Sequence, residues 1–93
     1  MIVGISEIEI FISESNSLKF KRQIIKSIKT KLQNKYNISI AEVEHQNLWQ
    51  RAKFGVAVVS CDSKVVDSTL NKVLDFIDND PRVEVINYQM EKL

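Results

Sequence analysis

The spacing of hydrophobic and polar residues alternates along the chain between the period of a strand and the period of a helix. In the segment 2–12, Ile8, Ile10 and Ile12 recur at every second position, which predicts a strand. Over 18–35, apolar residues recur every three or four positions, which predicts an amphipathic helix. Such patterns predict six elements: strand 2–12, helix 18–35, strands 38–44 and 53–61, a helix from Asp62 or Ser63 to Asp78, and strand 82–90.

Polar segments separate these elements. In the loop 13–17, Asn16 or Ser17 can cap the first helix, and the Asn-Asp-Pro segment 79–81 ends the second. The element order β-α-β-β-α-β has one common solution, an α+β ferredoxin-like sandwich. Right-handed crossovers then place both helices on one face of a four-stranded antiparallel sheet of order 4-1-3-2. We expect the loop 13–17, the start of the first helix, the connection 45–52 and the turn 79–82 to meet at one end.

The first and last strands both change the parity of their apolar residues. In the first strand the apolar positions are odd at Val3 and Ile5 and even from Ile8 onward, and the last strand switches between Val85 and Ile86. Either both strands carry a bulge at the switch, or apolar residues lie on both faces of the sheet. The second alternative would leave an apolar patch on the open face, which would call for a partner.

Composition indicates a small globular protein. A chain of 93 residues with 44% hydrophobic content suffices for one core, so we expect a single domain over 1–93. The one cysteine, Cys61, cannot form an internal disulfide, which suits a reducing compartment. The N-terminus lacks a signal-peptide pattern, and no apolar run approaches the roughly 20 residues of a membrane span. These features predict a cytoplasmic protein without membrane contact.

A formal net charge of +1 conceals a strong segregation of charge. Residues 17–37 hold seven basic residues and no acidic one, whereas 62–81 holds five aspartates and two lysines. Four cations of the first helix fall on one stripe beside its apolar face. They are Lys19, Arg22, Lys26 and Lys29. This basic stripe is a footprint for a nucleic-acid backbone, and a merely solvated helix face is the alternative.

Lys21 stands apart from the stripe because it projects onto the apolar arc between Ile28 and Leu32. Its place in the first turns would let its ammonium reach past the end of the sheet. With Lys19 and Arg22 it could attract a phosphate to the helix N-terminus. The alternative is a structural lysine whose stem packs on the core.

The connection 45–52 gathers side chains suited to recognising bases or protein surfaces. Its candidate contact residues are His45, Gln46, Trp49, Gln50 and Arg51. Aromatic, amide and guanidinium groups stack on bases and bond to their edges, and they also form protein hot spots. Because tryptophans are largely buried, we expect Trp49 to pack partly on the end of the sheet, with one edge open beside Arg51.

Other chemistries lack the residues that they need. One His and one Cys, 16 positions apart, make a poor start for a metal site, and we expect Cys61 to be a small core residue. Gly4 and Gly55 are isolated and form no phosphate loop. Phe11 and Phe54 lie where they do not support the sheet-face stacking of an RNA-recognition motif. We predict no enzymatic activity, no metal and no cofactor.

Two strings give the chain a resemblance to a known family. The segment 14–22, ESNSLKFKR, followed by 43–52, VEHQNLWQRA, resembles the YlxP-like family, a bacterial domain of unknown function. The family pattern looks like S-L-K-x-K-R with a later E-x-x-H-Q-x-L-W-Q-R-A, and the resemblance covers nearly the whole chain. It implies a ferredoxin-like fold. It also implies a gene that often lies among transcription and translation factors, near ribosome-binding factor A.

Pattern, charge and resemblance together predict a non-catalytic accessory protein that binds RNA or the ribosome. Helix 18–35 and the connection 45–52 would supply its contact surface. A protein–protein adaptor or homodimer that uses the open sheet face is the alternative. A small-molecule or enzymatic role for Lys21, His45 and Arg51 is a third hypothesis.

Overall fold

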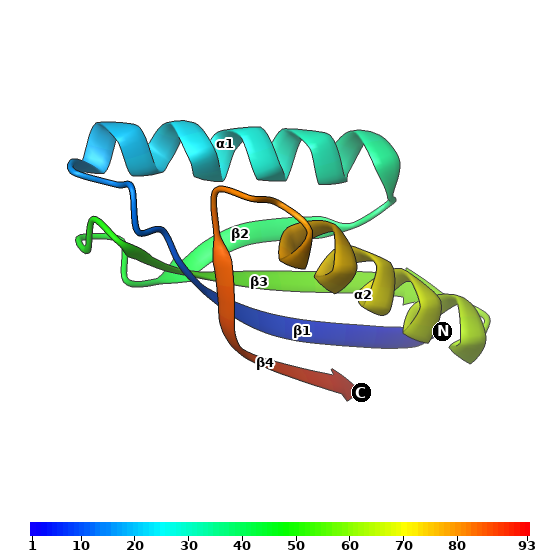
Figure 1. Ribbon diagram of the computed structural model, residues 1–93. Helices are drawn as coiled ribbons and strands as arrows, with labels where there is room; N and C mark the ends of the chain where they lie inside the picture. The colour runs from blue at the N-terminus through cyan, green and yellow to red at the C-terminus, as the bar shows by residue number, and fades with distance from the viewer.

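The computed structural model describes residues 1–93 and contains all six predicted elements (Figure 1). In chain order these are β1 (Ile2–Phe11), α1 (Leu18–Lys35), β2 (Ser39–Glu44), β3 (Arg51–Ser60), α2 (Ser63–Asp78) and β4 (Glu84–Lys92). The strands form one antiparallel sheet in the order β2-β3-β1-β4, which confirms the predicted strand order. Both helices cover the same face, and the other face is open (Figure 1).

The core lies between the helices and the even-numbered side chains of the two central strands. Ile8, Ile10, Phe54 and Val56 are buried there. The helices contribute Ile24, Ile25, Ile28, Leu32, Val66, Leu70, Val73 and Ile77. Gly4 continues the same series on β1, and a Cβ at that position would overlap the Val66 side chain of α2. Glycine therefore allows α2 to approach the sheet closely at this end.

The parity switch in β1 is not a bulge. β1 pairs with β3 in one continuous register, from Ile2 opposite Ser60 to Phe11 opposite Arg51. Even positions therefore face the helices along the whole strand, and Val3 and Ile5 lie on the open face. A bulge does occur in the pairing of β1 with β4, where the register shifts between Glu9 and Ile10. The extra residue is Ile86 of β4, because Glu9 pairs with Asn87 and Ile10 with Val85. The first alternative therefore holds for β4, whose parity switch is a bulge, and the second holds for β1, which has apolar residues on both faces.

Polar side chains cap both helices. Ser17 caps α1 by accepting a hydrogen bond from the Phe20 amide at 3.1 Å. Asp62 caps α2 by accepting one from the Lys64 amide at 2.9 Å. The prediction of a core position for Cys61 is wrong, because β3 ends at Ser60 and the cysteine lies exposed in the connection that follows. Neither helix has the length and hydrophobicity needed to cross a membrane.

The turn 79–82 does not join the other segments at the end of the fold. Arg82 donates a hydrogen bond from Nη2 to Ser27 Oγ, 3.3 Å away, in the middle of α1. The loop 13–17, the start of α1 and the β2–β3 connection (residues 45–50) do meet, since Gln50 donates to the Ser13 carbonyl at 3.0 Å and Lys21 donates to the His45 carbonyl at 2.6 Å. Three of the four predicted segments therefore form the end of the fold. The fourth turns back beside α1 because α2 ends before it reaches that level.

The ion pair between Asp80 and Arg82 should make the folded protein less stable in acid. Hydrogen bonds from the Arg82 side chain hold the pKa of the Asp80 carboxyl below its usual range. A carboxyl whose pKa is lower in the folded than in the unfolded protein stabilises the fold at pH values above its unfolded-state pKa of about 4. That contribution disappears as the pH falls through the folded-state pKa. We expect Asp80→Asn to lower stability at neutral pH and to flatten the acid limb of a urea-denaturation series. An unchanged pH profile would contradict this prediction.

Candidate functional site

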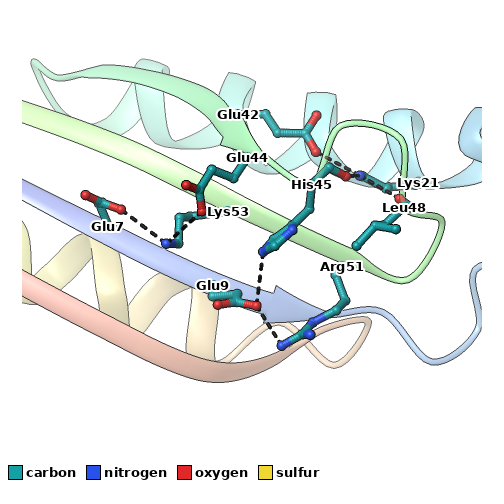
Figure 2. Close-up of polar contacts among 9 residues, drawn as sticks. All are labelled: Glu7, Glu9, Lys21, Glu42, Glu44, His45, Leu48, Arg51 and Lys53. Atoms are coloured by element: carbon teal, nitrogen blue, oxygen red, sulfur yellow. Dashed lines mark hydrogen bonds and ion pairs between the residues drawn. The ribbon is translucent and has the colours of Figure 1, made fainter.

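Lys21 is fully buried, and its ammonium contacts three oxygen atoms (Figure 2). Nζ donates hydrogen bonds to the backbone carbonyls of His45 at 2.6 Å and Leu48 at 2.7 Å. Oε2 of Glu42 lies 2.8 Å from Nζ as an ion pair, although the two are not aligned as a hydrogen bond. An ammonium has three donors, so this buried charge is fully surrounded by partners.

The sequence position of Lys21 explains this geometry. At about 100° per residue, Lys21 lies on the same arc of α1 as Ile25, Ile28 and Leu32, all of which face the sheet. It occupies the turn of the helix that covers the β2–β3 connection rather than the core. Burial leaves Lys21 no surface for direct contact with a partner. Its observed role is the structural one, to hold the connection against α1.

On the open face, Glu9 holds the same connection from the other side (Figure 2). Its Oε2 lies 2.7 Å from Arg51 Nη2 and 3.3 Å from His45 Nε2. The backbone of His45 has a φ of 66°, in the left-handed region that non-glycine residues rarely adopt. Lys21 binds the carbonyl of His45 and Glu9 contacts its ring, so contacts on both sides of the sheet maintain this conformation.

A second cluster of charged side chains lies on the open face beside the Glu9 contacts. Lys53 is 3.0 Å from Glu44 and 3.3 Å from Glu7 (Figure 2). Hydrogen bonding to Lys53 holds the pKa of the Glu44 carboxyl below its usual range. Hydrogen bonds to Glu44 and Glu7 raise the pKa of the Lys53 ammonium. Glu44 and Lys53 therefore both stay charged across the physiological range, and Lys53 compensates one of the two carboxylates beside it.

The basic stripe has the surface position that was expected of it. Lys19, Arg22 and Lys26 are exposed and Lys29 is half-buried. None of the four forms an ion pair. At about 100° per residue Arg22, Lys26 and Lys29 lie about 100–160° around α1 from Ser27 and Lys19 about 80°, and Ser27 is on the side of α1 that faces the turn after α2. The stripe therefore faces solvent on the flank away from α2.

Trp49 is 55% exposed, so it is covered only in part, and more of it is open than the single edge that we expected. Its neighbour Leu48 is 45% exposed as well. The reason is the buried ammonium beneath the connection, which draws the carbonyls of His45 and Leu48 inward and leaves the apolar side chains outside. Gln46 and Gln50 are also exposed.

Trp49 lines a shallow groove at the end of the sheet. The groove has a volume of about 540 Å³, and the residues around it are Phe11, Ser15, Asn16, Leu48, Trp49, Gln50 and Arg51. Three chain segments thus contribute to one hollow. Sequence reasoning missed Phe11 and Asn16 here. The available signal was register, because pairing of Phe11 with Arg51 puts the ring and the guanidinium side by side on the open face.

The apolar half of the open face forms a separate hollow of about 390 Å³. Ile5, Ala41, Val43 and Ala57 contribute its apolar side chains. No cluster of three or more His, Cys, Asp or Glu residues is placed to hold a metal ion. The structure thus separates two surfaces, the loop-and-helix end with the basic stripe and an apolar hollow on the open sheet face.

Comparison with known proteins agrees with the resemblance in the two sequence strings. Residues 3–90 match the model of a family described as protein of unknown function, DUF503. A relative from Bacillus subtilis (strain 168), described as uncharacterized protein YlxP, is 43% identical over 83 residues. That match covers 89% of this chain and 90% of the relative. The chain therefore belongs to the DUF503 family, the YlxP-like family of bacterial proteins whose function is unknown.

Proposed function

We propose that this protein is a non-catalytic accessory protein of the cytoplasm that binds RNA or the ribosome. The contact surface consists of the basic stripe of α1 and the β2–β3 connection. The observation that carries the proposal is the state of the stripe, in which four neighbouring cations have no acidic partner in the protein. The element order and the sheet order support a ferredoxin-like class for the fold.

Nearby acidic side chains form ion pairs with other cations and not with the stripe. Glu42 is engaged with Lys21 and Glu9 with Arg51, so neither of these carboxylates pairs with the stripe. The stripe is therefore the part of this end whose positive charge is uncompensated. The phosphates of a nucleic-acid backbone can pair with such a row of cations, and the pairing releases the counterions bound to the nucleic acid.

The salt dependence of binding tests this proposal. Four phosphate contacts predict a slope of log K against log salt of roughly −3 on single-stranded RNA. We expect filter binding or co-sedimentation with ribosomes to weaken along that slope. An affinity that does not change with salt would indicate apolar packing instead of phosphate contact, and it would rule out the basic stripe as the binding surface.

The apolar hollow on the open face supports a second candidate, a homodimer or adaptor surface. Ile5 and Ala57 are only half-buried there, and Val43 is 45% exposed. Apolar patches that are rimmed by charge commonly mark protein contacts. Size-exclusion chromatography with light scattering tests the homodimer, and a monomer at high protein concentration would contradict it.

A further inference from the structure

We infer that the groove beside Trp49 binds one unpaired nucleobase, so that the bound RNA is single-stranded at this point. The inference rests on the proposed function and names the chemical form of its ligand. The groove and the first residue of the basic stripe lie at the same end of the fold, because Asn16, which lines the groove, is three residues before Lys19. A strand whose phosphates follow α1 can therefore place a base in the groove.

The chemistry of the groove suits an aromatic heterocycle. Phe11, Leu48 and Trp49 offer apolar surface to the face of a ring. Asn16, Gln50 and Arg51 offer amide and guanidinium groups to its polar edge. Its volume of about 540 Å³ is large enough to hold one base.

The ion pair with Glu9 makes Arg51 a hydrogen-bond donor of fixed position instead of an unpaired charge. Its Nη2 is fixed on Glu9 Oε2 at 2.7 Å, and 46% of the side chain remains exposed at the groove. The carboxylate compensates the positive charge but leaves most of the guanidinium N–H groups available. Such a group favours hydrogen bonding or stacking with a base, whereas the unpaired cations of the stripe favour phosphate.

The connection that carries Trp49 is held in place before any ligand binds. Lys21 bonds its backbone from the helix side at 2.6 and 2.7 Å, and Glu9 holds His45 and Arg51 from the open face (Figure 2). Gln50 adds a hydrogen bond to the Ser13 carbonyl at 3.0 Å. A surface that is ordered in advance loses less entropy on binding. This explains how an exposed Trp on a short connection can serve as a stable stacking platform.

Duplex RNA does not offer what this groove requires. In an A-form helix the faces of the bases are stacked on one another, and only edges, hydroxyls and phosphates reach the surface. The stripe can contact phosphates of either form. The groove therefore distinguishes single strands from duplexes, and the stripe does not.

The experiment compares a single-stranded RNA of about ten nucleotides with the duplex of the same sequence. Trp49 is the only tryptophan, so its emission reports directly on the groove. We expect the single strand to quench it and the duplex to leave it unchanged. Trp49→Ala should weaken binding of the single strand by about 5–150-fold, the range for loss of one aromatic stacking partner, and Trp49→Phe should retain most of the binding.

Tyr88→Ala is the matched control. Tyr88 is an aromatic of similar exposure, 54%, but lies on the edge strand β4 and does not line the groove. Its loss should leave RNA binding unchanged, and urea midpoints show whether each variant is folded. If the single strand binds along the predicted salt slope but ignores Trp49→Ala, the groove inference is overturned and the proposed function stands. Equal weakening of strand and duplex by Trp49→Ala also overturns it. If neither RNA nor ribosomes bind, the proposed function itself fails.

Discussion

Replacing all four residues of the basic stripe by Gln is expected to weaken RNA or ribosome binding by on the order of 10²–10³-fold at about 0.1 M salt. The physical reason is that each cation that neutralises a phosphate releases counterions, and the gain from this release is lost with the charge. The fold should survive, because surface substitutions rarely change stability by more than about 0.5 kcal/mol each. Filter binding measures the affinity, and urea denaturation checks the fold.

The chain offers a control with the same change in net charge. Four other lysines form no ion pair and are exposed outside the stripe, namely Lys31, Lys35, Lys64 and Lys72. Replacing these four by Gln removes the same charge from a different surface. We expect it to weaken binding far less than the stripe variant. Equal losses for the two variants would show that only overall charge matters and would refute the stripe as a site.

Lys21→Met is expected to lower the free energy of unfolding by about 3–5 kcal/mol, as for loss of one partner in a buried ion pair. The substitution leaves Glu42, whose side chain is largely buried, without its cation 2.8 Å away. It also leaves the carbonyls of His45 and Leu48 without their donor. For a domain of about 5–10 kcal/mol total stability, this loss approaches unfolding. Urea denaturation at neutral pH measures it.

Two further variants separate the causes. Lys26→Met makes the same substitution at an exposed position of α1 and should change stability by less than about 0.5 kcal/mol. The double variant Lys21→Met/Glu42→Gln removes both charges and should recover part of the stability lost in the single variant. A double variant no more stable than Lys21→Met would assign the loss to the connection's carbonyls instead of to the ion pair.

Much of the fold followed from local pattern. The alternation in β1, the helical spacing of Ile24, Ile28 and Leu32, and the polar segments between elements depend on neighbours in sequence. Local periodicity determines which face of each element is apolar, and the handedness of crossovers then limits how the elements pack. This is why the element bounds agree within two residues and why the strand order was correct.

The candidate site was predictable only as a set of residue types. Exposure of Lys19, Arg22 and Lys26 followed from their angle on the helix, which is again a local property. The exposure of Trp49 did not, because it depends on the Lys21 ammonium, 24 residues from His45, which turns the backbone of the connection inward. Composition favoured burial of a tryptophan, and a long-range contact overrode it.

What the sequence determined by itself is the set of elements, their apolar faces and the segregated basic stripe. What the tertiary structure decided is the environment of each polar side chain. Glu9 and Glu42 are two acids on different strands, and nothing in their local sequence indicates that one holds Arg51 and the other Lys21. The physical reason is that periodicity operates over a few residues, whereas ion pairs, burial and grooves arise between segments that only packing brings together.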